Sequence, residues 1–135
     1  MNTKGIGEVS EGIVLAHLLK SGRTVLLPFG NNQRYDLVVD EDGTFVRVQV
    51  KTGRLERGCV VFNTSSVNGF TGKRTTYAGT ADVFMVYCPA TGGVYRVPVA
   101  ECGASMMSLR VDPAAKNWST IHWAKDYLVE LDEAT

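Results

Sequence analysis

The chain has 135 residues, and its 14 lysines and arginines balance its 14 aspartates and glutamates, so its formal net charge at pH 7 is zero. Hydrophobic residues make up 44% of the chain and charged residues 21%, which is ordinary globular usage and argues against disorder. No apolar run approaches the roughly 18 residues that a membrane-spanning helix needs. We therefore expect a single domain over residues 1–135 that does not enter a membrane.

The first elements predicted along the chain are a helix and three strands. Apolar residues recur at helical spacing from residue 6 to residue 20, and Ser21-Gly22 then provides a stop signal. Residues 23–27 are predicted to form a short strand. Two longer strand patterns, 35–40 and 44–51, flank a Gly-containing turn, which is a strong signal for a β-hairpin.

The rest of the chain favours strands over helices. Further strands are expected at residues 59–64, 82–88, 94–97 and around Leu109, with a short helical turn near 99–102 and a last helix over 121–128. Residues 65–80 are rich in Gly, Thr and basic side chains and are predicted to form a long loop, which at this length is usually functional. This order favours an α/β (α+β) fold in which an N-terminal helix packs on a mixed central β-sheet.

The second strand of the hairpin has a polar face. Alternation places Val46, Val48 and Val50 on one face, and Arg47, Gln49 and Lys51 on the other. If Asp40 pairs with Phe45, then Asp36 falls opposite Gln49 and shares the polar face with Lys51. A turn one residue shorter would move Asp36 to the wrong face. On charge pattern alone, the more ordinary explanation is an exposed ion pair between Asp36 and Lys51.

A family resemblance makes the predicted function of these residues more specific. The spacing of Glu11, Tyr35-Asp36 and Gln49-Val50-Lys51 resembles the PD-(D/E)XK nuclease superfamily, in which a variant with Gln at the second acidic position exists. The segments GEVSEGIVLAHLLKSG, LLPFGNNQRYDLVVD, VRVQVKTGR and DVFMVYCP resemble one branch in particular. That branch holds the group I intron-encoded PD-(D/E)XK homing endonucleases and their standalone relatives. The resemblance runs from about Lys4 to residues 121–124 and implies a restriction-endonuclease-like core.

The resemblance implies a DNA endonuclease that uses Mg²⁺ or Mn²⁺. Asp36 is expected to be the main metal ligand, with the side-chain oxygen of Gln49 and the backbone carbonyl of Val50 as further ligands. Glu11 is expected to hold a metal-bound water. Lys51 is expected to orient or deprotonate the attacking water, or to stabilise charge in the transition state. The implied catalytic set is therefore Glu11, Asp36, Gln49 and Lys51. Glu8, one helical turn before Glu11, is a secondary candidate.

Positive charge is concentrated beside this predicted site. Residues 45–80 carry a net charge of +5, whereas residues 1–44 carry −2 and residues 81–135 carry −3. Arg54 and Arg57 are predicted to flank the scissile phosphate, and Lys73, Arg74 and Tyr77 are predicted to contact double-stranded DNA. A solvated loop with no ligand explains the same charges. The zero total therefore does not exclude a nucleic-acid partner, because binding depends on where charges lie.

Three alternatives remain open at this point. A Holliday-junction resolvase or a repair nuclease shares the same core, and a catalytically silent DNA-binding module would be compatible with Gln49. One active site per subunit also predicts a homo-oligomer, a dimer or a tetramer, if both DNA strands are cut. Cys59, Cys88 and Cys102 form no CxxC pair, and the N-terminus does not resemble a signal peptide, so we expect a cytoplasmic, nucleoid-associated protein.

Overall fold

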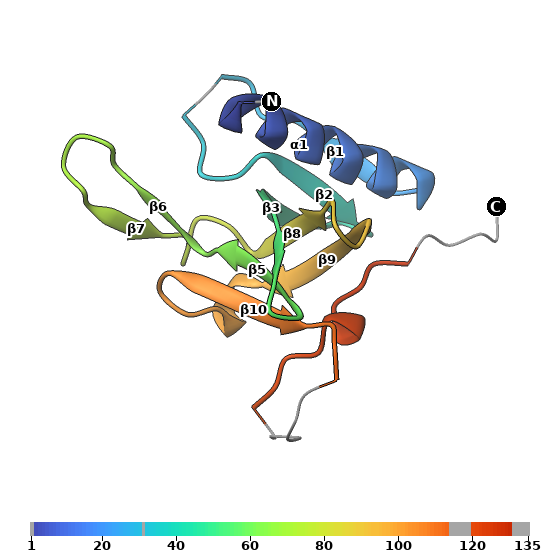
Figure 1. The fold of residues 1–135 in the computed structure, drawn as a ribbon. Helices are drawn as coiled ribbons and strands as arrows, with labels where there is room; N and C mark the ends of the chain where they lie inside the picture. Colours follow the sequence, from blue (N-terminus) through green and yellow to red (C-terminus); the bar gives the residue numbers. More distant parts are fainter. Residues whose placement is uncertain (1, 31, 114–119, 131–135) are drawn as a thin grey trace.

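The computed structural model describes residues 2–30, 32–113 and 120–130. Figure 1 shows three layers, with helix α1 (Thr3–Lys20) on one face of a five-stranded sheet and a smaller three-stranded sheet on the other face. A third, two-stranded sheet projects from the side of these layers. In the described part of the chain, no helix is both long enough and apolar enough to cross a membrane.

The central sheet has the strand order β1-β2-β3-β8-β9. Its strands are β1 (Thr24–Leu26), β2 (Leu37–Glu41), β3 (Thr44–Thr52), β8 (Val83–Cys88) and β9 (Gly93–Pro98). Strands β3 and β8 run parallel, and all the other neighbours are antiparallel, so the predicted mixed sheet is confirmed. The two faces of this sheet support separate hydrophobic clusters, because residues alternate between its faces.

The second sheet has the strand order β10-β5-β4, and the projecting hairpin lies between β5 and β10 in the chain. These strands are β10 (Met106–Arg110), β5 (Cys59–Asn63) and β4 (Arg54–Glu56), and the hairpin consists of β6 (Ser65–Val67) and β7 (Arg74–Thr76). Two 3-10 turns, η1 (Val99–Glu101) and η2 (Ala124–Asp126), complete the described elements. Strand β4 was not predicted, because its three residues are all exposed and show no alternation in burial.

Helix α1 is held over the central sheet by a few apolar side chains. Asn2 caps its N-terminus and accepts a hydrogen bond from the backbone N–H of Gly5 at 2.8 Å, so the helix begins three residues earlier than predicted. Val14 and Leu18, four residues apart, are buried against the valines of β2 and β3. The helix thereby presents its N-terminal half, which contains Glu8 and Glu11, to the edge where β2 begins.

The other face of the central sheet contacts the second sheet. Phe84 of β8 is completely buried and packs edge to face on Phe62 of β5, with ring centroids 5.7 Å apart. Leu109 of β10 is also fully buried in this cluster. The second sheet thus covers the face of β8 that α1 does not cover.

Two of the predicted secondary-structure assignments, at residues 65–80 and 121–128, are wrong. Residues 65–80 are not an unstructured loop, because Ser65 pairs with Thr76 and Val67 with Arg74 in the projecting hairpin. Residues 121–128 do not form a helix: outside η2 they extend along other strands. The N–H of Arg110 bonds the carbonyl of His122, and the N–H of Arg96 bonds the carbonyl of Tyr127. Pairing with existing strand edges replaces helical hydrogen bonds here.

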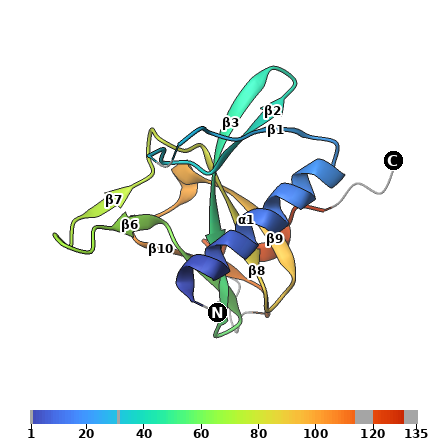
Figure 2. The same ribbon diagram turned by 90° about the horizontal axis from the view of Figure 1, so that it is seen from above.

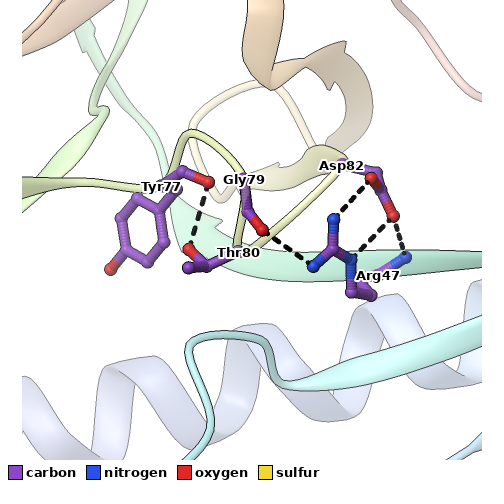
Figure 3. A network of polar contacts seen from close by, with 5 residues as sticks. All are labelled: Arg47, Tyr77, Gly79, Thr80 and Asp82. Carbon is purple, nitrogen blue, oxygen red and sulfur yellow. Dashed lines mark hydrogen bonds and ion pairs between the residues drawn. The ribbon is translucent and has the colours of Figure 1, made fainter.

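An arginine–aspartate contact fixes the start of β8 beside β3 (Figure 3). Asp82 Oδ2 accepts hydrogen bonds from the backbone N–H of Arg47 at 2.8 Å and from its Nε at 3.1 Å. Arg47 Nη2 donates to Asp82 Oδ1 at 3.0 Å, and Nη1 donates to the Gly79 carbonyl at 3.0 Å. The hydrogen bond from Arg47 lowers the pKa of Asp82, so this carboxylate stays ionised beside the guanidinium.

Replacement of glycine by alanine should have opposite effects on stability at two positions, Gly12 and Gly53. A Cβ added to Gly12, on the exposed side of α1, meets nothing within 4 Å, so Gly12→Ala should raise the free energy of unfolding by about 0.5–1 kcal/mol. At Gly53, between β3 and β4, a Cβ would lie 2.8 Å from Val60 Cγ1 and 3.0 Å from Val86 Cγ1. Gly53→Ala should therefore lower the free energy of unfolding by about 1–3 kcal/mol. Urea unfolding of both variants measures the difference; equal stabilities would show that the two sheets can separate at this junction.

Candidate active site

Asp36 lies at the end of the β2–β3 ladder. The hairpin register is confirmed, with Asp40 opposite Phe45, but the ladder ends at Leu37 opposite Val48. The N–H of Asp36 also bonds the Val48 carbonyl, at 2.8 Å, so the predicted pairing of Asp36 with Gln49 is not formed. Two successive residues opposite one partner are the mark of a β-bulge, which changes the direction of a side chain.

The bulge brings the Asp36 carboxylate to the backbone of Val50. Asp36 Oδ2 accepts the N–H of Val50 at 2.8 Å, in the position that a further β2 carbonyl would occupy if the strand continued. The N–H and the carbonyl of one strand residue point to the same side, so the Val50 carbonyl also points toward this edge of β3. Gln49 Nε2 lies 3.5 Å from that carbonyl oxygen. Side chains from both faces of β3 thus meet at Val50.

Glu11 and Asp36 line the same cavity. Its volume is about 360 Å³, and its other walls come from Tyr35 and the segment between β1 and β2, at Leu27, Pro28, Gly30 and Gln33. Burial and the neighbouring Asp36 carboxylate, with a smaller effect of Glu8, raise the pKa of Glu11 to about 7. The helix and the hairpin therefore hold two carboxylates against each other in a half-buried site.

This donor set fits a hard divalent cation. Two carboxylates that repel each other lose that repulsion when a cation binds between them, and carboxylate and carbonyl oxygens are the ligands that Mg²⁺ prefers. Within residues 2–30, 32–113 and 120–130, no group of three or more His, Cys, Asp or Glu side chains converges. A metal held by Asp36 and Glu11 would therefore take its remaining protein ligands from neutral oxygens, such as the Val50 carbonyl.

Lys51 lies on the same strand but has a different neighbour. Its Nζ donates a hydrogen bond to the Tyr77 hydroxyl at 3.1 Å and lies 4.7 Å from the centroid of that ring. Lys51 also lines a second cavity, of about 310 Å³, with Gly7 and Ser10 of α1. No ion pair within 4 Å joins Lys51 to Asp36 or Glu11, and all three side chains are in the described part of the chain. The simple surface ion pair is therefore excluded as the reason for these two charges.

The position of Tyr77 corrects its predicted role. We expected this ring to contact DNA, but only 5% of its surface is exposed, because it packs edge to face on Phe84 with centroids 5.4 Å apart. The guanidinium carbon of Arg34 lies 4.2 Å from the ring centroid. Arg34 was missed in the sequence, where the only signal was a basic residue directly before Tyr35-Asp36.

The other basic candidates lie in two separate places. Arg54 and Arg57 belong to the second sheet and its β4–β5 turn, and neither lines the two cavities beside Asp36 and Lys51. Arg54 is also paired with Glu56 at 2.6 Å. The chain leaves the central sheet at Gly53 and carries these two arginines away from the Asp36 cavity, and their contact with the scissile phosphate stays a prediction. Lys73 and Arg74 are exposed in the projecting hairpin.

Comparisons with known proteins agree with this architecture. The sequence matches the family described as PD-(D/E)XK endonuclease over residues 1–130. The structure is similar to that of a bacterial homing endonuclease, I-Ssp6803I, with a TM-score of 0.75 and 27% sequence identity; the match covers 95% of this chain and 89% of the other. No curated protein matches the sequence significantly. The predicted resemblance and the predicted restriction-endonuclease-like fold are thus confirmed.

Proposed function

This chain belongs to the PD-(D/E)XK endonuclease family, and from that premise we propose that it hydrolyses phosphodiester bonds of double-stranded DNA with a divalent metal ion, Mg²⁺ or Mn²⁺. The observation that carries the proposal is the cavity in which Glu11 and Asp36 face each other beside the edge of β3. Paired carboxylates at the start of β2, together with the Val50 carbonyl and Lys51 on the neighbouring strand, form a suitable set for this reaction.

Each residue has a role that follows from its position. Asp36 and Glu11 would hold the metal directly or through water, and the carbonyl of Val50 and the side-chain oxygen of Gln49 would complete the ligand set. When bound, such a metal neutralises charge on the phosphate and makes a coordinated water more acidic. Glu8 contributes negative potential to the site through its effect on Glu11.

Lys51 supplies the positive charge that the protein itself brings to the reaction. Its ammonium group stabilises negative charge that develops on the phosphate and orients the attacking water. The Tyr77 hydroxyl, 3.1 Å from Nζ, holds the long lysine side chain in one place. Tyr77 is itself fixed between Phe84 and Arg34, so we assign it a positioning role for Lys51.

The type of endonuclease is the finer part of the proposal. The similarity to a bacterial homing endonuclease over nearly the whole chain favours a homing-type enzyme over a junction-resolving or repair nuclease. The alternative of a silent DNA-binding module depends on Gln49, which removes one negative charge from the ligand set. The retained pair of Glu11 and Asp36 argues against it, because an uncompensated pair of carboxylates is costly without a cation.

The described part of the chain offers one such site per subunit. Hydrolysis of both strands of a duplex at one locus requires two sites related by approximate two-fold symmetry. We therefore propose that the active form on DNA is a homo-oligomer, a dimer or a tetramer. Sedimentation of the protein with and without a duplex would measure this directly, and a monomer that makes double-strand breaks would contradict it.

Cleavage assays test the proposal. The wild-type protein should convert supercoiled plasmid to nicked and linear DNA in Mg²⁺ or Mn²⁺ and should be inactive in EDTA. Mg²⁺ should also raise the melting temperature of the DNA-free protein, because a ligand that binds only the folded state stabilises it. A strong preference for four-way junctions over linear duplex would favour the resolvase alternative. DNA binding without cleavage of any of these substrates would leave only the silent binding module.

A further inference from the structure

The β6–β7 hairpin projects from the body as an arm. Figures 1 and 2 show it extending away from the three layers in both views. Its two strands are joined by a turn in which Asn68 Oδ1 accepts the N–H groups of Phe70 at 2.9 Å and Thr71 at 3.1 Å. The side chain of Phe70, at the tip of the arm, is fully exposed. The arm therefore presents an ordered turn whose aromatic ring is exposed and does not pack into the hydrophobic core.

The arm is positively charged and contains no acid. Between Glu56 and Asp82 there is no aspartate or glutamate, whereas Lys73 and Arg74 follow the tip directly. Arg74 Nη1 donates to Ser65 Oγ at 2.8 Å across the hairpin, so its charge is held close to the strands. Lys73 is exposed, and its charge is available to an anionic partner. This distribution suits an anionic surface such as the phosphates of DNA and does not suit an apolar protein surface.

The root of the arm is tied to the candidate active site. Arg34 Nη1 donates to Ser66 Oγ at 2.7 Å, and Nη2 donates to the Thr76 carbonyl at 3.0 Å. The same guanidinium lies against Tyr77, whose hydroxyl accepts the hydrogen bond from Lys51. A rigid connection of this kind fixes the arm's direction relative to the site before any ligand binds, which lowers the entropic cost of binding.

We propose that the β6–β7 hairpin enters the major groove of duplex DNA and reads base edges there with Phe70, while Lys73 contacts a phosphate. The inference rests on the proposed function and adds the part of the protein that gives sequence preference. The major groove is wide enough for a two-stranded β-ribbon, and an apolar ring recognises the methyl group of thymine.

The length of the arm predicts where on the DNA this contact falls. Phe70 lies seven positions before Tyr77, and extended chain spans about 3.3 Å per residue, so the Cα atoms of the two residues lie at most about 23 Å apart. At about 3.4 Å per base pair, this backbone reach corresponds to about seven base pairs of DNA. Specificity and chemistry are thereby assigned to separate parts of one chain.

Two arm variants and one matched control test the proposal. The probe is a duplex fragment of a plasmid that the wild-type protein cuts, centred on the main cleavage site, with binding measured in EDTA. Phe70→Ala should weaken binding about tenfold with unchanged salt dependence, and Lys73→Ala should reduce the slope of log affinity against log salt by about 0.9. Phe45→Ala, which removes another exposed phenylalanine at the far end of β3, should bind as wild type.

A chemical readout identifies the groove. Methylation of guanine N7 blocks the major groove, so it should interfere with wild-type binding within about seven base pairs of the cut, and Phe70→Ala should be less sensitive. Unchanged affinity and unchanged interference in Phe70→Ala would overturn the arm's role while wild-type cleavage still supported the endonuclease. Unchanged affinity with a lower sedimentation mass would assign Phe70 to a contact between subunits instead. A wild-type protein that neither binds nor cuts duplex DNA would overturn both proposals.

Discussion

Replacing Asp36 with Asn is expected to slow plasmid cleavage by at least about 100-fold, because the variant loses the negative charge that, in the proposed mechanism, would hold a metal at the reacting phosphate. The amide oxygen of Asn can still accept the N–H of Val50, so the end of the β2–β3 ladder is retained. The rise in melting temperature on adding Mg²⁺ should disappear in the same variant. Cleavage rate and metal-induced stabilisation therefore report the same loss independently.

Asp42→Asn is the matched control for this prediction. Asp42 lies in the β2–β3 turn with a φ of 53°, a conformation that Asn adopts readily, and it is exposed. This variant should cleave DNA and respond to Mg²⁺ as the wild type does. If Asp36→Asn cut DNA at the wild-type rate, the metal site would have to lie elsewhere in the chain, and the role assigned to Glu11 would be lost with it.

Lys51→Ala is expected to lower the cleavage rate at saturating DNA by about 100-fold while the protein still binds Mg²⁺. In the proposed reaction the ammonium group acts on charge that develops at the phosphate, whereas Asp36 and Glu11 line the cavity that is proposed to hold the metal. The melting temperature should therefore still rise on adding Mg²⁺. This combination separates Lys51 from Asp36, for which cleavage and metal response are lost together.

Tyr77→Phe distinguishes positioning from simple support of the fold. The variant keeps the buried ring against Phe84 and Arg34 and removes only the hydroxyl that accepts the hydrogen bond from Lys51. We expect a roughly tenfold lower rate at saturating DNA with little change in the DNA concentration at half-maximal rate. An unchanged rate in Tyr77→Phe, together with a large loss in Lys51→Ala, would show that Lys51 needs no partner to be positioned.

Much of the fold followed from local patterns in the sequence. The alternation of apolar and polar residues in β3 and the turn at Glu41-Asp42-Gly43 determine the hairpin register. A slip of one residue would expose the buried side chains of Val46, Val48 and Val50. Helical spacing in α1 likewise places Val14 and Leu18 on the buried face, although Ile6, Val9 and Leu19 stay exposed. The order of motif residues along these elements was sufficient to predict the family, and the comparison with family models confirmed it.

The candidate site was only partly predictable. The sequence placed Asp36, Gln49 and Lys51 on one face by extending the hairpin ladder. The structure ends that ladder at Leu37 and joins Asp36 to the Val50 backbone and to Glu11 instead. A β-bulge at a strand end has no clear signal in a single sequence, because it depends on where the neighbouring strand begins.

By itself, the sequence determined the elements whose hydrophobic pattern repeats locally, together with the spacing of the motif. Tertiary structure decided everything that depends on contacts between distant segments: the arm at residues 65–76, the extended tail around residues 121–129, and the burial of Tyr77 between Arg34 and Phe84. The arm's strands have three residues each and no alternation in burial, and the tail pairs with residues 12 to 35 positions earlier in the chain. Local propensity is weak in such segments, and the available strand edges and rings decide their conformation.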